Sequence, residues 1–189
     1  MQRRLEEYGK IVEITGFRNA HIKDARSFSQ ILAGKLPTDC EVQFFDADLV
    51  ATWQHLYFAV LNALMNLKSN RGISNSIAVE TVLYASAQRQ ILKAINFIGL
   101  KPDSENAAMV VICENAESAK AGLDAAAKLV GAQLDESVLE LTETKAKRIR
   151  KVFDISDEEI NVAKTRSVGS EQALVDLVVE RVALLSTRL

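Results

Sequence analysis

Residues 73–100 read ISNSIAVETVLYASAQRQILKAINFIGL, and this stretch predicts two short helices joined by a tight junction. Ser76 is placed to cap the first helix with its hydroxyl group, and Ser86 is placed to cap the second. The second helix carries a predicted buried stripe at i, i+4 and i+7, formed by Ile91, Ile95 and Ile98. Gly99 is typical of a helix end. The rest of the chain is expected to pack around this helical pair.

The junction between the two predicted helices is polar, with the sequence SAQRQ. Its arginine and two glutamines are expected in the first turn of the second helix, where backbone N–H groups are unpaired and the helix dipole is positive. Such donors suit a phosphate, a sugar edge or a carboxylate. The residues expected at this site, with the cations nearest in sequence, are Gln88, Arg89, Gln90, Lys93, Lys68 and Arg71. The alternative interpretation is a polar helical turn that faces only solvent.

The length and charge of the chain limit its class. A chain of 189 residues suits a single domain, residues 1–189, with residues 1–8 as a charged lead-in that is prone to fraying. The net charge of −2 excludes a generally basic nucleic-acid-binding protein. Any contact with nucleic acid must therefore be a local patch of cations.

The two cysteines, Cys40 and Cys113, both lie in apolar, strand-like runs. We expect them to be buried thiols of a cytoplasmic protein rather than part of a secreted disulfide framework. The apolar stretch of residues 47–67 is about as long as a membrane span, but it includes the polar side chains of Gln54, His55 and Asn62. The sequence therefore predicts a buried central helix and no contact with a membrane.

Hydrophobic patterning elsewhere alternates between the strand and helix periods, which predicts an α/β fold. The expected strands cover residues 10–17, 41–45 and 107–113. The expected helices cover residues 24–33, 46 or 48 to 68, 115 or 117 to 131, 142–153 and 170–187, with a short one beginning at Ser156. The fold class is thus a single domain in which a small mixed β-sheet is surrounded by helices.

No catalytic constellation is evident in the sequence. The eight glycines are scattered and form no phosphate-binding loop, and two cysteines and two histidines offer no zinc spacing. His55 on the central helix is interpreted as a hydrogen-bonded core residue, and Cys113 as an inert buried thiol. We therefore expect no enzyme, no cofactor and no metal, with a small-molecule enzyme that uses His55 or Cys113 as the minor alternative.

Two further surfaces are candidates for interaction. Five cations fall between Lys145 and Lys151, although cations also favour helix C-termini without binding anything. The last helix has a surplus of apolar side chains, and an exposed apolar face typically marks a partner surface. The candidate partner-binding residues are Val182, Leu184 and Leu185. Burial in the core explains these three residues equally well.

The same stretch carries a resemblance to a known family. The residues that carry it are Ser76–Glu80, Leu83–Ser86, Arg89-Gln90-Ile91, Ala94-Ile95 and Gly99, followed in order by weaker matches at residues 11–14, His55, Ala59, 110–112 and 180–185. Together they resemble the TPRKB-type (PRPK-binding) small subunit of the KEOPS complex, in its archaeal form. The likeness covers most of the chain.

The resemblance implies a function that the residues alone do not. Members of this family belong to a complex that makes threonylcarbamoyl-adenosine in tRNA, while a separate subunit performs the catalysis. They bind and stimulate a PRPK/Bud-type kinase-ATPase and capture the single-stranded 3′ CCA end of tRNA. Arg89 and Gln90 match the family motif and are the residues we expect to contact RNA. The main alternative is a protein-only adaptor, in which the face around Arg89 docks an acidic partner.

Overall fold

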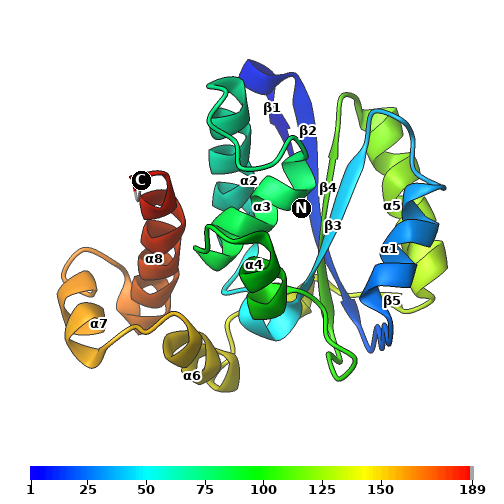
Figure 1. Cartoon of the computed structure of the whole chain (residues 1–189). Helices are drawn as coiled ribbons and strands as arrows, with labels where there is room; N and C mark the ends of the chain where they lie inside the picture. Colours follow the sequence, from blue (N-terminus) through cyan, green and yellow to red (C-terminus); the bar gives the residue numbers. More distant parts are fainter. Residues whose placement is uncertain (188–189) are drawn as a thin grey trace.

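The structure is a computed structural model that describes residues 1–187, and its centre is a small antiparallel sheet (Figure 1). The described strands are β1 (Gln2–Leu5), β2 (Lys10–Arg18), β3 (Glu41–Asp46), β4 (Ala107–Cys113) and β5 (Gln133–Leu134). Their order is β1-β2-β4-β3, and β5 pairs with the end of β2. The predicted α/β class and small sheet are confirmed.

Strand direction in this sheet differs from the mixed arrangement expected, because every pairing among the described strands is antiparallel. The connection from β3 to β4 explains part of the difference. Its helices return the chain to the edge where β3 ends, so that Asp46 pairs with Ala107. The direction of the next strand depends on how many times the helical connection passes along the sheet. That number is set by packing, and hydrophobic periodicity does not reveal it.

Residues 1–8 are not frayed as expected. Residues 2–5 form the edge strand β1, which pairs with β2 from Gln2 opposite Glu13 to Leu5 opposite Lys10. A short 3₁₀ turn, η1 (Glu6–Tyr8), and Gly9 at φ 60° close the hairpin. The side chain of Leu5 is buried, which fixes the register because a one-residue slip would expose it.

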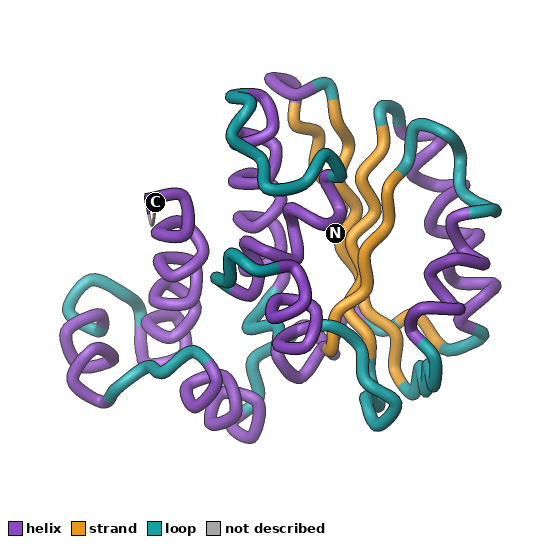
Figure 2. Tube along the Cα trace, in the orientation of Figure 1, coloured by secondary structure: helices purple, strands orange, loops and turns teal. Residues whose placement is uncertain are grey.

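Helices cover both faces of the sheet (Figures 1 and 2). One face packs against α1 (Ala25–Ala33) and α5 (Ala116–Val130), and the other against α2 (Trp53–Lys68), α3 (Ile77–Ser86) and α4 (Ile91–Ile98). Alternate residues of β4 divide between the two cores: Ala108, Val110 and Ile112 face one, and the odd-numbered residues face the other. Both faces of β4 are buried, which explains its continuous apolar sequence.

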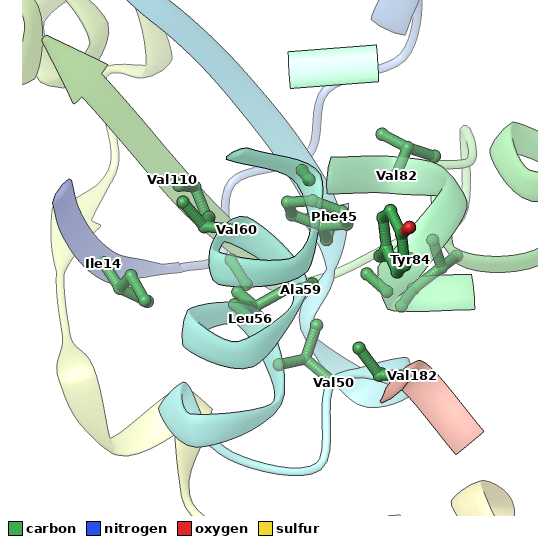
Figure 3. Packing of buried hydrophobic residues seen from close by; sticks show 14 of the residues in the cluster. Ile14, Phe45, Val50, Leu56, Ala59, Val60, Val82, Tyr84, Val110 and Val182 are labelled. Atoms are coloured by element: carbon green, nitrogen blue, oxygen red, sulfur yellow. The ribbon is translucent and has the colours of Figure 1, made fainter. Parts of the chain in front are cut away.

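The larger core forms around α2 (Figure 3). Ile14 and Val110 of the sheet lie close to Leu56 and Val60 of this helix, and all four belong to one cluster of buried hydrophobic residues. The predicted end of the helix at Lys68 is confirmed, but its start is not. A separate 3₁₀ turn, η2 (Ala47–Leu49), precedes it, because the Asp46 carboxylate accepts from the Asp48 N–H and closes that turn locally. Among the described residues, no helix is long and apolar enough to cross a bilayer.

Three outer helices complete the described chain after the 3₁₀ turn η3 (Glu136–Leu139). They are α6 (Glu143–Val152), α7 (Asp157–Ala163) and α8 (Gly169–Leu184), which is followed by η4 (Leu185–Thr187). Thr142 caps α6 and Ser156 forms a capping box with Glu159, at the two positions where these helices were expected to begin. The three helices share a core of their own, and Phe97 and Val152 contact both this core and the larger one.

The expectation of two separate thiols is wrong, because Cys40 and Cys113 form a disulfide. Cys40 directly precedes β3, and Cys113 ends β4. The register pairs Glu41 with Ile112, so the next pair outward brings the two cysteines opposite each other, with their Cα atoms 4.3 Å apart. Their positions are 73 apart in the sequence, and only the antiparallel register makes them neighbours.

Candidate functional site

The junction between α3 and α4 has a different local structure from the one predicted. Ala87 adopts φ 51° and ends α3, and the hydroxyl of Ser86 donates to the Leu83 carbonyl instead of capping the next helix. The next helix, α4, begins only at Ile91, with Gln90 in the N-cap position and no side-chain cap. Gln88, Arg89 and Gln90 therefore lie in a connecting loop before the helix, not in its first turn.

A pocket of about 410 Å³ opens beside this junction. Its walls come from the end of α2, the loop that follows it, α3, the junction and η4. The polar and charged side chains that line it are Asn66, Arg71, Glu80, Tyr84, Arg89 and Ser186. The structure thus brings together Arg71 and Arg89, two of the cations expected at this site.

The other residues expected at the site lie outside the lining of this pocket. Gln90 and Lys93 are exposed near the start of α4, and Gln88 is half-buried in the junction. Lys68 points elsewhere: its Nζ lies 3.4 Å from Glu7 Oε1 and 5.3 Å from the ring centre of Tyr8. Closeness in sequence therefore predicted the position of Arg71 correctly but not that of Lys68.

Two hydrogen bonds between Asn66 and the backbone of Arg71 hold Arg71 at the pocket. The Asn66 carbonyl accepts from the Arg71 N–H, and the Asn66 side-chain amide donates to the Arg71 carbonyl, both at 3.0 Å. Gly72 follows, where an added Cβ would lie 2.8 Å from a Leu67 methyl carbon and 2.7 Å from the Ser74 carbonyl oxygen. The loop therefore lies tightly against α2, and the Arg71 side chain leaves a fixed backbone.

Glu80 also lines the pocket and was not anticipated from the sequence. Its side chain is fully buried, and its Oε1 accepts from the Ser74 N–H at 2.6 Å. Its Oε2 is also buried and has no hydrogen-bond partner within residues 1–187. The available signal was a carboxylate in the mostly apolar run of residues 77–85, where a solvated charge has no place.

The pKa of the Tyr84 hydroxyl depends on the charged side chains of the same pocket. Burial raises the pKa of its hydroxyl, the nearby Glu80 carboxylate raises it further, and the Arg89 guanidinium opposes both effects. Arg89 and Glu80 carry opposite charges, line the same pocket and both act on this phenol. The aromatic body of Tyr84 belongs to the large core, so its position is fixed by packing.

The predicted partner-binding residues separate into two groups. Val182 is fully buried and Leu185 is 5% exposed, whereas Leu184 is 37% exposed. Core packing therefore accounts for the first two, and only Leu184 is accessible. Residues 173, 174, 177, 178, 182 and 185 are all buried and form the inward face of α8 and η4.

A larger exposed apolar surface lies on α4, contrary to prediction. Of the expected buried stripe, only Ile98 is buried, together with Ala94. Ile91 and Ile95 are 36% and 45% exposed, and the adjacent Leu92 is 75% exposed. We call the surface formed by Ile91, Leu92 and Ile95 the α4 face. The 3.6-residue period predicted an apolar stripe correctly but could not tell whether a neighbouring element covers it.

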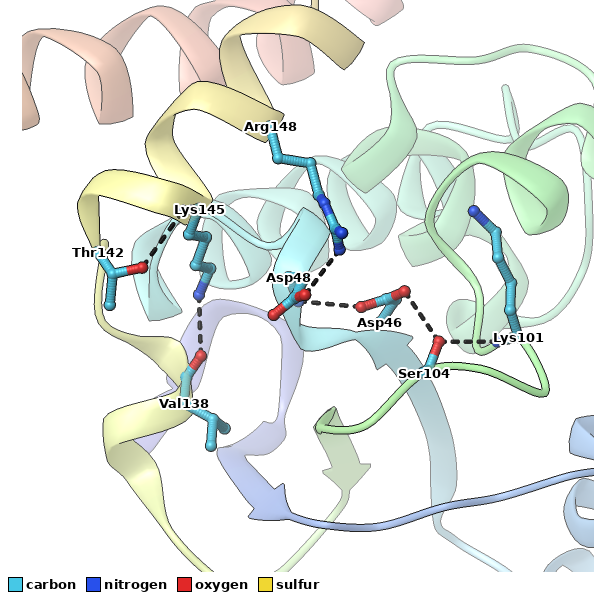
Figure 4. A network of polar contacts seen from close by, with 8 residues as sticks. All are labelled: Asp46, Asp48, Lys101, Ser104, Val138, Thr142, Lys145 and Arg148. Carbon is cyan, nitrogen blue, oxygen red and sulfur yellow. Dashed lines mark hydrogen bonds and ion pairs between the residues drawn. The ribbon is translucent and has the colours of Figure 1, made fainter.

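The basic cluster of α6 is largely neutralised (Figure 4). Lys145 is buried, and its ammonium group donates to the carbonyls of Val138 and Glu140. Burial lowers the pKa of Lys145 to about 8, against the attraction of Asp48, Asp46 and Glu140. Three other cations of the cluster have carboxylate partners, namely Lys147 with Glu143, Arg148 with Asp48 and Arg150 with Asp157. The cluster is therefore not a surface of five unpaired charges.

His55 is a hydrogen-bonded core residue, as predicted. The Ala51 N–H donates to its Nδ1, so the proton resides on Nε2, which donates to the Ala85 carbonyl at 2.7 Å. Burial lowers the pKa of the imidazole to about 4. Since His55 is fully enclosed and Cys113 is part of a disulfide, neither residue presents a free reactive atom. No group of three or more potential metal ligands was found within residues 1–187.

Fold and site together define an antiparallel α/β protein with a charged pocket and an exposed apolar helix face. The family model described as kinase binding protein CGI-121 matches residues 18–186, and the chain belongs to that family. Regulatory protein Cgi121 of Methanocaldococcus jannaschii is 34% identical over 146 residues, which cover 77% of this chain and 83% of that protein. The resemblance stated from the sequence is confirmed.

Proposed function

We propose that this protein is a non-catalytic cytoplasmic subunit of a KEOPS complex, which binds and stimulates a PRPK/Bud-type kinase-ATPase and captures the 3′ CCA end of tRNA. The family described as kinase-binding and the relative named as a regulatory protein support the regulatory part of this proposal. The observation that carries the RNA-binding part is the pocket lined by both Arg71 and Arg89.

The chemistry of this pocket suits the end of a single RNA strand. Guanidinium groups bind phosphate oxygens in pairs of charge-assisted hydrogen bonds, and they also stack on bases. Recognition of single-stranded RNA uses such donors together with surfaces against which a base can pack. Here Ile73, Leu83 and Leu185 supply apolar lining beside the two arginines. The pocket is local, which fits a chain whose net charge is −2.

Fluorescence anisotropy with matched tRNA, intact or lacking its 3′ CCA, tests this proposal for the purified protein and for Arg89→Glu. The matched control is Arg166→Glu, which makes the same charge change at an exposed position near α7. Loss of a charge-assisted contact of about 1.5–3 kcal/mol should weaken binding of intact tRNA by roughly ten- to a hundredfold. The slope of log affinity against log salt should also become shallower by about 0.7 per lost phosphate contact.

The intact and trimmed tRNAs separate the outcomes. Tighter binding of intact tRNA that depends on Arg89 and not on Arg166 supports capture of the 3′ end. Equal affinity of the Arg89→Glu variant and the wild type for intact tRNA would count against this site. Equal binding of both tRNAs would indicate nonspecific contact elsewhere.

For the kinase interface we propose the α4 face, with Leu184 as a second accessible apolar position. Exposed apolar side chains at i and i+4 of a helix, beside a third one, are typical of a helix that packs against a partner. Lys93 lies among them on the same helix and supplies a positive charge at the border. Binding to a kinase would bury the 75% of Leu92 that is now exposed.

Co-purification with the kinase tests the α4 face. Leu92→Glu should abolish or strongly weaken the complex while leaving the circular dichroism spectrum and melting temperature unchanged, because Leu92 contributes little to the core. Val162→Glu on α7 is the matched control, since Val162 is 65% exposed. A complex that survives Leu92→Glu but not Val162→Glu would place the interface on the outer helices instead.

The second candidate function is a protein-only adaptor, and the adjacency of Arg89 to the α4 face favours it. In that case the guanidinium of Arg89 would pair with an acidic group of the docked protein, at the edge of the same interface. The anisotropy and co-purification experiments distinguish the two functions. Kinase binding that requires both Arg89 and Leu92, with no binding of tRNA at any salt concentration, would favour the adaptor.

A further inference from the structure

Glu80 presents an unusual problem of hydrogen bonding. Its carboxylate is fully buried, yet only Oε1 has a donor, the Ser74 N–H. Oε2 has none within residues 1–187. A buried carboxylate oxygen without a donor is costly, and nearly all such atoms in native proteins are satisfied by protein, water or ligand. Because Glu80 belongs to the lining of the pocket, the missing donor can come from a group that enters there.

We propose that Glu80 accepts a hydrogen bond from the ribose hydroxyls of the last nucleotide of an RNA strand, so that the pocket reads a free 2′,3′-diol. This inference rests on the proposed capture of an RNA 3′ end. A carboxylate on ribose hydroxyls is a recurrent way to recognise a nucleoside. The 2′-hydroxyl is also the group by which proteins distinguish RNA from DNA.

The arrangement of charges gives the strand a direction. Arg71, Arg89 and Glu80 all line the pocket, but the two arginines are exposed and Glu80 is fully buried. Phosphates are therefore favoured beside the exposed arginines, and a neutral group that donates hydrogen bonds is favoured beside the buried carboxylate. The terminal nucleoside of an RNA 3′ end has its phosphate on one side and two hydroxyls on the other. A pocket of about 410 Å³ lies within the range of small-ligand sites.

The test changes the RNA first and the protein second. Affinity is measured by anisotropy for a short single-stranded RNA ending in CCA and for the same RNA with a 2′,3′-dideoxy terminal residue. The wild type should bind the dideoxy RNA about tenfold more weakly, because the buried carboxylate then stays unpaired. In Glu80→Gln the side-chain carbonyl still accepts from Ser74, but the negative charge is gone. The preference for the diol should then fall below about threefold.

The outcomes separate this inference from the proposed function. If the wild type binds both RNAs equally well, reading of the diol is wrong while RNA capture stands. If the wild type binds neither RNA, both proposals fail. If Glu80→Gln keeps the full preference for the diol, the hydroxyls are read by another group, and the assignment of Glu80 is overturned. Glu117→Gln, at an exposed position on α5, controls for the loss of one negative charge.

Discussion

At the scale of single residues, buried polar groups do more to hold the elements of this protein together than exposed charges do. His55 spans from Ala51 to Ala85 by two hydrogen bonds and joins the start of α2 to the end of α3. Lys145 similarly ties α6 to the carbonyls around η3. By contrast, the exposed ion pairs of α6 are of the kind that contributes little to stability. The two helices that His55 joins, α2 and α3, both contribute residues to the pocket.

His55 makes the stability of the protein depend on pH. Its pKa is about 4 in the folded protein and 6.5 in the unfolded chain, so the unfolded state binds more protons between these values. The contribution of the neutral imidazole is complete above pH 6.5 and is lost as the pH falls towards 4. From this residue the free energy of unfolding should be about 2 kcal/mol lower at pH 5 than at pH 7.

Urea unfolding of the wild type and of His55→Gln at pH 7 and pH 5 measures this contribution. The difference in stability between the two proteins should shrink by about that amount on acidification, because glutamine does not titrate. His21→Asn is the control, since His21 is exposed. A difference between wild type and His55→Gln that is the same at both pH values would contradict the buried neutral imidazole.

At the scale of elements, the junction between α3 and α4 determines where Arg89 lies. The sequence patterns of both helices are clear, but the turn between them depends on Ala87 in the left-handed region. An L-residue other than glycine is disfavoured there by roughly 1–2 kcal/mol. The chain adopts this turn because α3 and α4 are both anchored by buried residues, such as Ala85 and Ile98.

Ala87→Gly should therefore stabilise the protein. Relief of the left-handed strain exceeds the added entropy of a glycine in the unfolded chain, for a net gain of about 1 kcal/mol. Ala85→Gly, two residues earlier in the regular helix and in the core, should instead destabilise it by about 1 kcal/mol or more. Thermal unfolding followed by circular dichroism would show the two opposite shifts. A lower melting temperature for Ala87→Gly would mean that the junction is not in the left-handed conformation.

At the scale of the whole molecule, the disulfide joins β3 to β4 and so closes a loop that contains α2, α3 and α4. The same end of β3 supports the pocket helix, because the Glu41 carboxylate accepts from Ser76 Oγ, the Ile77 N–H and the Ala78 N–H at the start of α3. The disulfide bond and these hydrogen bonds therefore connect β4, β3 and the N-terminus of α3. The Ser74 N–H in turn donates to the Glu80 carboxylate, so the loop after α2 is joined to the same helix.

Reduction of the disulfide should lower the free energy of unfolding substantially. Closing a loop of 73 residues removes entropy from the unfolded chain worth about 4 kcal/mol. Urea unfolding of the wild type with and without a strong reductant would measure the effect. The Cys40→Ala, Cys113→Ala double variant should be less stable and should not respond to reductant. An unchanged unfolding midpoint for the reduced wild type would contradict this stabilising role.

Much of this architecture was predictable from local patterns. The caps at Asp24, Ser76, Thr142 and Ser156 and the strand at 107–113 follow from hydrogen-bonding preferences and hydrophobic periods that act over a few residues. The edge strand β1 was missed because its residues QRRL look charged and become a strand only by pairing with β2. At the site, Arg71 and Arg89 were predicted, whereas Glu80 was hidden within an apolar helix.

The sequence by itself determined the family, the α/β class, the positions of most helices and the presence of a cationic junction, because these depend on residues that are neighbours along the chain. Only the tertiary structure decided that Cys40 bonds to Cys113, that Arg71 and Glu80 meet Arg89 at one pocket while Lys68 lies elsewhere, and that the α4 face is left exposed. The physical reason is that register, burial and charge pairing depend on which distant segments pack together.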